Sequence, residues 1–292
     1  MPPTFDDPRA LARAATAIEN GRPEAEQIAA EVFPRTGRAL LAGITGAPGS
    51  GKSTLVNEFV RLLRRAGQKV GVIAVDPSSP WTGGAILGDR IRMQDHHADP
   101  GVFIRSMATR GRLGGVARST LDLALLLDAA GADTVLIETV GVGQDEIEIA
   151  RLADVVAVVL VPGMGDDVQA IKAGIMEIAD VFLLNKADHP GADRLDRVLR
   201  ETGTTVPVVR TVATEGAGVE EALAAIRAAP RRSNETARWQ HRLRELVRDR
   251  VIEGIPDDAF AAAAADVAER RVSPRDAAEQ LLAAHYSLAT TH

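Results

Sequence analysis

A glycine-rich segment near residue 50 has the composition and spacing of a phosphate-binding loop. Residues 46–53 match the pattern G-x-x-x-x-G-K-[ST] in full, after an apolar run and before a helical stretch. Glycines let successive backbone N–H groups point at one phosphate, and the following helix adds the positive end of its dipole. Lys52 would place its charge on the β- and γ-phosphates, and Ser53 would offer its hydroxyl to Mg²⁺. The alternative, a glycine-rich turn with a chance Lys-Ser pair, is disfavoured by this context. The loop residues predicted to bind nucleotide are Gly46, Ala47, Pro48, Gly49, Ser50, Gly51, Lys52, Ser53 and Thr54.

A second motif, N-K-x-D at residues 185–188, indicates which base the nucleotide carries. Asp188 can accept hydrogen bonds from both N1–H and the exocyclic amine of guanine, a pair of donors that adenine lacks. The stem of Lys186 can lie over the purine, and Asn185 can tie this segment to the phosphate loop. The backbone of Val212 and Ala213 could contact the guanine carbonyl. A plain polar turn is the alternative, but beside a phosphate loop the motif favours GTP over ATP.

Acidic residues at the ends of two further apolar runs could serve a metal ion. Asp76 follows one run, and Glu138 follows another and begins E-x-x-G where D-x-x-G is usual. Because glutamate is longer, we expect Glu138 to meet Mg²⁺ through a water molecule. Between them, a Pro- and Gly-rich segment carries Asp89 and Arg92, which reach the same site if the segment folds over the nucleotide. Arg92 could equally be a surface helix residue paired with a carboxylate.

Two weaker candidates are Gln144 and the pair His96 and His97. Gln144 could orient water, but its loop is out of register with the spacing of small GTPases. Adjacent residues on a helix point about 100° apart and chelate a metal poorly. We therefore expect the two histidines to face solvent.

Short valine-rich runs alternate with helical stretches through the middle of the chain, which predicts a doubly wound, mostly parallel α/β sheet. The runs are too short for the rival interpretation, a set of buried helices. They are Ala39–Ile44, Val70–Val75, Val102–Ile104, Thr134–Ile137, Val155–Val161, Val181–Leu184 and Val206–Val209. The expected division is a helical extension at 1–38, a nucleotide-binding domain at 39–230 and a helical region at 231–292. The last region carries Trp239, Leu243, Leu246 and Val247 on a helix that needs an apolar partner.

Composition excludes several classes of protein. The 292 residues include no cysteine, which rules out disulfides, thiolate zinc sites and a cysteine nucleophile. Aromatic residues are 3% of the chain and its formal net charge is −6, so we expect no nucleic-acid partner. The apolar runs are too short to span a bilayer, and the first residues lack a signal-peptide pattern. We therefore expect no membrane association and a cytoplasmic location.

Taken together, five segments closely resemble the methylmalonyl-CoA mutase-associated GTPases. This family comprises the MeaB-type chaperones of adenosylcobalamin mutases, formerly labelled arginine/ornithine transport kinases. The resemblance covers roughly residues 8–289. The segments are G-x-P-G-S-G-K-S-T, D-P-S-S-P-x-T-G-G-x-I-L-G-D-R-x-R-M, E-T-V-G-V-G-Q, V-P-G-M-G-D-D-V-Q-A-I-K-A-G-I-M-E-I-A-D and N-K-A-D.

The resemblance implies a slow GTPase that an acyl-CoA mutase stimulates and that gates cobalamin loading and protects the mutase. It implies Mg²⁺ as cofactor, and a homodimer held partly by the C-terminal helices. Val212 is a departure, because serine is common there. The implied hydrolytic residues are Lys52, Asp89, Arg92 and Glu138, the implied metal residues are Ser53, Asp76, Asp89 and Glu138, and the implied partner-sensing switch includes Gly163, Asp166 and Lys172.

Three alternative functions remain. A small-molecule kinase on the same fold would need an acceptor pocket and would not need N-K-x-D. A metallochaperone GTPase for nickel enzymes would deliver metal through Cys and His clusters, which the lack of cysteine disfavours. A nucleotide-gated binding module would turn over little GTP by itself.

Overall fold

The computed structural model describes residues 3–76, 94–96, 98–108, 115–139, 151–163, 176–231 and 235–289. The chain forms two compact units, residues 1–233 and residues 234–292. The first unit contains the sheet, and the second consists of helices.

Seven parallel strands form the sheet of the first unit in the order β3-β2-β4-β1-β5-β6-β7 among the described residues. The fold class and each expected strand are confirmed. The last strand begins later than expected, at Val208, because Pro207 before it has no N–H to donate to a neighbour. The strands are β1 (Leu40–Gly46), β2 (Val70–Asp76), β3 (Val102–Ala108), β4 (Thr134–Glu138), β5 (Val155–Leu160), β6 (Val181–Asn185) and β7 (Val208–Thr211).

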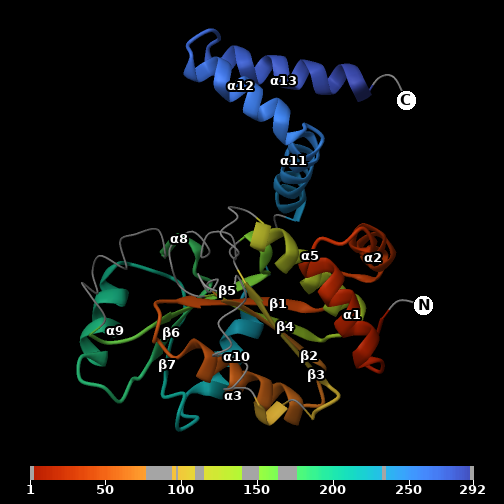
Figure 1. The fold of residues 1–292 in the computed structure, drawn as a ribbon. Helices are drawn as coiled ribbons and strands as arrows, with labels where there is room; N and C mark the ends of the chain where they lie inside the picture. Colours follow the sequence, from red (N-terminus) through yellow and green to blue (C-terminus); the bar gives the residue numbers. More distant parts are fainter. Residues whose placement is uncertain are drawn as a thin grey trace. The chain divides into compact units, whose positions relative to one another are not determined.

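Helices cover both faces of this sheet (Figure 1). The helices α1 (Pro8–Glu19), α2 (Glu24–Val32) and α5 (Gly115–Ala129) lie on one face, and α3 (Lys52–Arg65) and α10 (Val219–Ala228) on the other. Side chains of each strand alternate between the faces, so Leu41 of β1 joins the first core while Ala42 and Ile44 join the second. Helix α9 (Ala192–Glu201) packs on Leu184 of β6. Shorter helical segments are η1 (Phe33–Arg35), η2 (Gln94–His96) and α8 (Met176–Ile178).

The N-terminal helices share the core of the first unit. Leu11 and Ile18 of α1 are buried in the same cluster as α5 and the strands. At the end of α1, Glu19 accepts a hydrogen bond from Arg105 of β3 at 2.9 Å. The chain between α2 and β1 is also held, because the buried Asp128 of α5 accepts the N–H of Ala39 at 3.0 Å. These contacts make α1 and α2 a covering layer of the sheet.

Three aspartates pin the amino ends of neighbouring strands. Asp133, Asp154 and Asp180 each stand directly before a strand and accept an N–H from the neighbouring strand or from the residue just before it. The donors are the backbone of Lys69 at 2.7 Å, Leu41 at 3.1 Å and Val156 at 2.8 Å, in that order. Each bond satisfies a donor and fixes the relative register of two strands. The register at this edge then determines which residues meet at the opposite, carboxyl edge.

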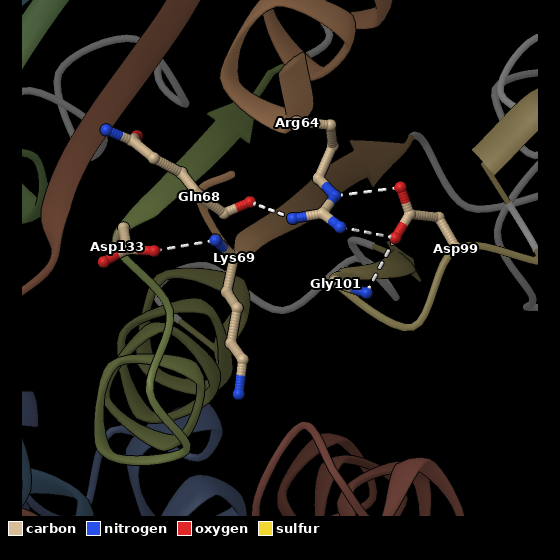
Figure 2. A network of polar contacts seen from close by, with 6 residues as sticks. All are labelled: Arg64, Gln68, Lys69, Asp99, Gly101 and Asp133. Carbon is tan, nitrogen blue, oxygen red and sulfur yellow. Dashed lines mark hydrogen bonds and ion pairs between the residues drawn. The ribbon is translucent and has the colours of Figure 1, made fainter. Parts of the chain in front are cut away.

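A polar network at the same amino edge holds the far end of α3 (Figure 2). The guanidinium of Arg64 donates to both carboxylate oxygens of Asp99 at 2.8 Å and also to the carbonyl of Gln68. Asp99 also accepts the N–H of Gly101 at 2.8 Å, and a Cβ at Gly101 would lie 2.2 Å from the Arg64 guanidinium carbon. Hydrogen bonding to Arg64 holds the pKa of Asp99 below its ordinary value. The network anchors α3, whose other end carries the phosphate loop.

The second unit consists of α11 (Glu235–Glu253), α12 (Asp257–Ala268) and α13 (Pro274–Ala289). Ser273 caps α13, because its hydroxyl oxygen accepts the N–H of Asp276 at 3.2 Å and the hydroxyl donates to that residue's carboxylate at 2.8 Å. On α11, the side chains of Leu243 and Val247 are 59% and 61% exposed. Among the described helices of the chain, none has the length and apolar character to cross a bilayer.

Candidate functional site

The segment between β1 and α3 forms a tight loop that requires its glycines. Gly46, Gly49 and Gly51 have φ angles of 143°, 76° and 89°, which other residues rarely adopt. A Cβ at Gly46 would lie 2.2 Å from the carbonyl oxygen of Val159, and one at Gly51 would lie 2.4 Å from Nδ2 of Asn185. The loop therefore lies against β5 and against the segment that follows β6.

Lys52 holds the beginning of this loop. Its side chain is 6% exposed, and its Nζ donates to the carbonyls of Gly46 at 2.8 Å and Ala47 at 3.0 Å. The N–H of a trans peptide points opposite to its carbonyl, so the N–H of Ala47 points away from the lysine. These bonds use two of the three N–H donors of the ammonium group and hold its positive charge beside the loop.

The N-K-x-D segment holds the other half of the loop. Asn185 donates from Nδ2 to the carbonyl of Ser50 at 2.8 Å, and Lys186 donates from Nζ to the carbonyl of Gly49 at 3.0 Å. These bonds turn the neighbouring N–H of Gly51 the opposite way, at the amino end of α3, where an anion is favoured. The two predicted motifs are thus in direct contact.

Asn185 is the centre of this contact and is only 2% exposed. Its Oδ1 accepts the hydroxyl of Thr211 at 3.1 Å and the N–H of Ala213 at 3.2 Å. Sequence reasoning missed Thr211, whose only signal was its place directly before Val212. Lys186 follows in a left-handed conformation, with φ 54°, and Asp188 is exposed. The aspartate carboxylate is therefore accessible from outside.

The first two N–H groups after β7 form hydrogen bonds within the protein. The N–H of Val212 donates to the carbonyl of Ala217 at 2.9 Å, and that of Ala213 donates to Asn185. These two residues, expected near a guanine carbonyl, thus order the segment itself.

Ser53 and Glu138 meet on the α3 face of the sheet. The serine hydroxyl donates to Oε1 of Glu138 at 2.7 Å, and the residues are 6% and 4% exposed. The extra methylene of glutamate lets the carboxylate reach the serine directly. Two adjacent oxygen donors fit a hard cation such as Mg²⁺, which takes one or two carboxylates and completes its shell with phosphate and water. Within the described ranges no three His, Cys, Asp or Glu side chains form a metal cluster.

On the opposite face, the residue after Glu138 is held as well. Thr139 donates from Oγ1 to Oγ1 of Thr45 at 3.0 Å, and its N–H donates to the carbonyl of Ile44 at 3.1 Å. Both threonines are buried. Sequence reasoning missed this pair, because nothing in the spacing links the two positions.

The other predicted site residues are described only in part. Asp76 ends β2 at the carboxyl edge of the sheet, opposite Ala108 of β3. Gly163 is exposed with φ 78°. Asp89, Arg92, Gln144, Asp166 and Lys172 lie outside the described residues.

The expectation for His96 was wrong. Its side chain is 8% exposed, because η2 places it beside Asn57 and Arg61 of α3. Burial, and then the nearby charge of Arg61, lower the pKa of His96 below its ordinary value. His97 lies outside the described residues.

The chain is similar to known proteins in sequence and in fold. A family profile described as "Methylmalonyl Co-A mutase-associated GTPase MeaB" matches residues 11–267. A protein of Pyrococcus abyssi named as a GTPase is 55% identical over 226 residues, which cover 74% of this chain and 70% of that protein. Another protein named as a GTPase, from Caulobacter vibrioides, is 40% identical and aligns over 95% of this chain and 94% of its own. A crystal structure of a "LAO/AO transport system kinase" superposes with a TM-score of 0.66 at 30% identity, covering 94% of this chain and 92% of that one.

Proposed function

The chain belongs to the family of methylmalonyl-CoA mutase-associated GTPases of the MeaB type, and from this premise we propose that it gates cofactor loading and protection of an adenosylcobalamin-dependent acyl-CoA mutase. GTP hydrolysis is the activity of the family, and the fold is that of a P-loop GTPase. The client we propose is methylmalonyl-CoA mutase, because the family description names it.

The main observation in support of a nucleotide site is the contact through Asn185, which joins the phosphate loop to N-K-A-D. We assign phosphate binding to residues 46–54, with Lys52 supplying positive charge from its place beside the loop carbonyls. Asp188 would select guanine through its exposed carboxylate. The close packing of the two motifs supports binding of base and phosphates by one connected site.

Ser53 and Glu138 would hold Mg²⁺, with Asp76 and Asp89 completing the shell. The buried oxygen donors of Ser53 and Glu138 support this assignment. The ion would supply positive charge at the β- and γ-phosphate oxygens. Within the chain, Glu138 would orient the serine hydroxyl and Arg92 would approach the γ-phosphate.

The test of the mutase proposal is GTP turnover measured with and without purified methylmalonyl-CoA mutase. Turnover should be slow alone and rise with the mutase. Lys172→Ala should leave basal turnover intact and remove the rise, if the segment containing Gly163, Asp166 and Lys172 senses the partner. Equal stimulation of both proteins would place the signal elsewhere, and no stimulation of the natural chain would refute the client.

Phosphoryl transfer to a small molecule is a second candidate, because a similar solved structure is named as a transport system kinase. GTP labelled in the γ-phosphate distinguishes the two reactions. Release of label as inorganic phosphate supports the GTPase, whereas label on an added amino acid supports the kinase.

We also propose a cytoplasmic homodimer held by the second unit. The exposed Leu243, Val247 and Ile252 of α11 support a partner for this helix. Light scattering should give a dimer for the full chain and a monomer for a chain that ends at Pro230. A monomeric full chain would refute the dimer.

A further inference from the structure

The end of β4 is held from both faces of the sheet at the point where the chain leaves it. On the α3 face, Glu138 accepts the hydroxyl of Ser53 at 2.7 Å. On the α5 face, Thr139 donates its hydroxyl to Thr45 at 3.0 Å. Consecutive residues of an extended chain face opposite ways, so the two bonds act on the same short piece of backbone.

Thr45, which accepts this hydrogen bond, is also held in a fixed position. Thr45 lies on β1 directly before Gly46, where the phosphate loop begins, and is 0% exposed. The backbone bond from the N–H of Thr139 to Ile44 runs alongside the hydroxyl pair. The start of the phosphate loop and the start of the segment after Glu138 are therefore joined by two adjacent hydrogen bonds.

We infer that the Thr139 hydroxyl is a positioning residue for GTP hydrolysis, acting with Thr45 to fix the Glu138 carboxylate relative to Ser53. The carboxylate is on the residue next to Thr139, so a shift of that backbone moves it. Neither threonine hydroxyl takes part in the contacts of Lys52 and Asn185 with the loop carbonyls. Hydrolysis should therefore fall while nucleotide affinity is retained. This inference rests on the GTPase reaction of the site described above.

Thr139→Val removes the hydroxyl and keeps the shape of the side chain. Single-turnover hydrolysis of GTP should slow about fivefold to tenfold, as expected for the loss of one hydrogen bond. Affinity for GDP, measured by calorimetry, should stay within about threefold. Thr139→Ser should restore hydrolysis, because it restores the donor.

A matched control lies at the other end of the same strand. Thr134 of β4 is also buried, and its hydroxyl donates to Oε1 of Gln68 at 3.3 Å, at the edge of the sheet away from the phosphate loop. Thr134→Val should hydrolyse GTP as fast as the natural chain. Equal slowing in this control would mean that general destabilisation causes the loss, and would overturn the inference.

The double variant Thr45→Val with Thr139→Val distinguishes an effect on the position of Glu138 from an effect on the stability of the fold. Apolar groups would then face each other, so the thermal stability lost in Thr139→Val should largely return. Hydrolysis should remain slow. The inference would be overturned if the double variant recovered both thermal stability and the rate of hydrolysis. It would also be overturned if Thr139→Val hydrolysed GTP at the natural rate, or if Thr139→Ser hydrolysed it slowly. If Thr139→Val does not fold, the double variant still decides. A natural chain without GTP hydrolysis would instead refute the GTPase reaction itself.

Discussion

Asn185→Ala should weaken nucleotide binding and destabilise the first unit together. The natural side chain makes three buried hydrogen bonds, to the carbonyl of Ser50, the hydroxyl of Thr211 and the N–H of Ala213. Alanine leaves those three groups without this partner. At about 1 kcal/mol for each bond, the free energy of unfolding should fall by roughly 3 kcal/mol. The phosphate and base loops would also lose their link, which should cost about 2 kcal/mol of binding, or roughly thirtyfold in GDP affinity.

Urea unfolding and calorimetric titration with GDP and Mg²⁺ measure the two effects. Asn185→Asp keeps the two acceptor positions but replaces the amide donor with a charged oxygen that faces the Ser50 carbonyl, so it should weaken GDP binding at least as strongly as alanine does. Asn57→Ala is the matched control, because the side-chain oxygen of Asn57 has no hydrogen-bond partner among the described residues. Its GDP affinity should match the natural chain. Unchanged GDP affinity in Asn185→Ala would refute the reasoning that one residue connects base and phosphate recognition.

Lys52→Ala should weaken GDP binding by more than about a hundredfold, because it removes the positive charge that faces the phosphates. Circular dichroism should show that the variant is folded. A GDP affinity like that of the natural chain would reject the assignment of the loop to phosphate binding. Asp188→Asn should shift preference from GTP to xanthosine triphosphate, measured by competition, whereas the exposed Asp193→Asn should not. An unshifted preference would exclude Asp188 as the base contact. The pKa of Asp99 is lowered by Arg64, so its contribution to stability is present above about pH 3.8 and is lost as the pH falls toward the lowered pKa. Asp99→Asn should therefore lower the free energy of unfolding at neutral pH by about 1 kcal/mol and flatten its dependence on pH in acid. Equal acid dependence in both proteins would show that this ion pair does not govern it.

Local patterns in the sequence determined the elements and the motifs. Each valine-rich run forms a strand, because a strand buried on both faces of a parallel sheet needs apolar side chains at consecutive positions. That pattern is visible within a few residues of sequence. The phosphate loop could also be predicted from the sequence, because its glycines are required by local backbone angles such as φ 89° at Gly51. Proximity of the two motifs also followed, because parallel strands bring their carboxyl ends to one edge.

Tertiary structure alone decided which groups meet across that edge. Thr139 and Thr45 are 94 residues apart, and Asn185 reaches Ser50 across 135 residues. Such bonds depend on strand order and register, which the aspartates before the strands hold through contacts with neighbouring strands. The burial of His96 has the same origin, because a histidine's exposure is determined by the helix that packs against it and not by its neighbours in sequence.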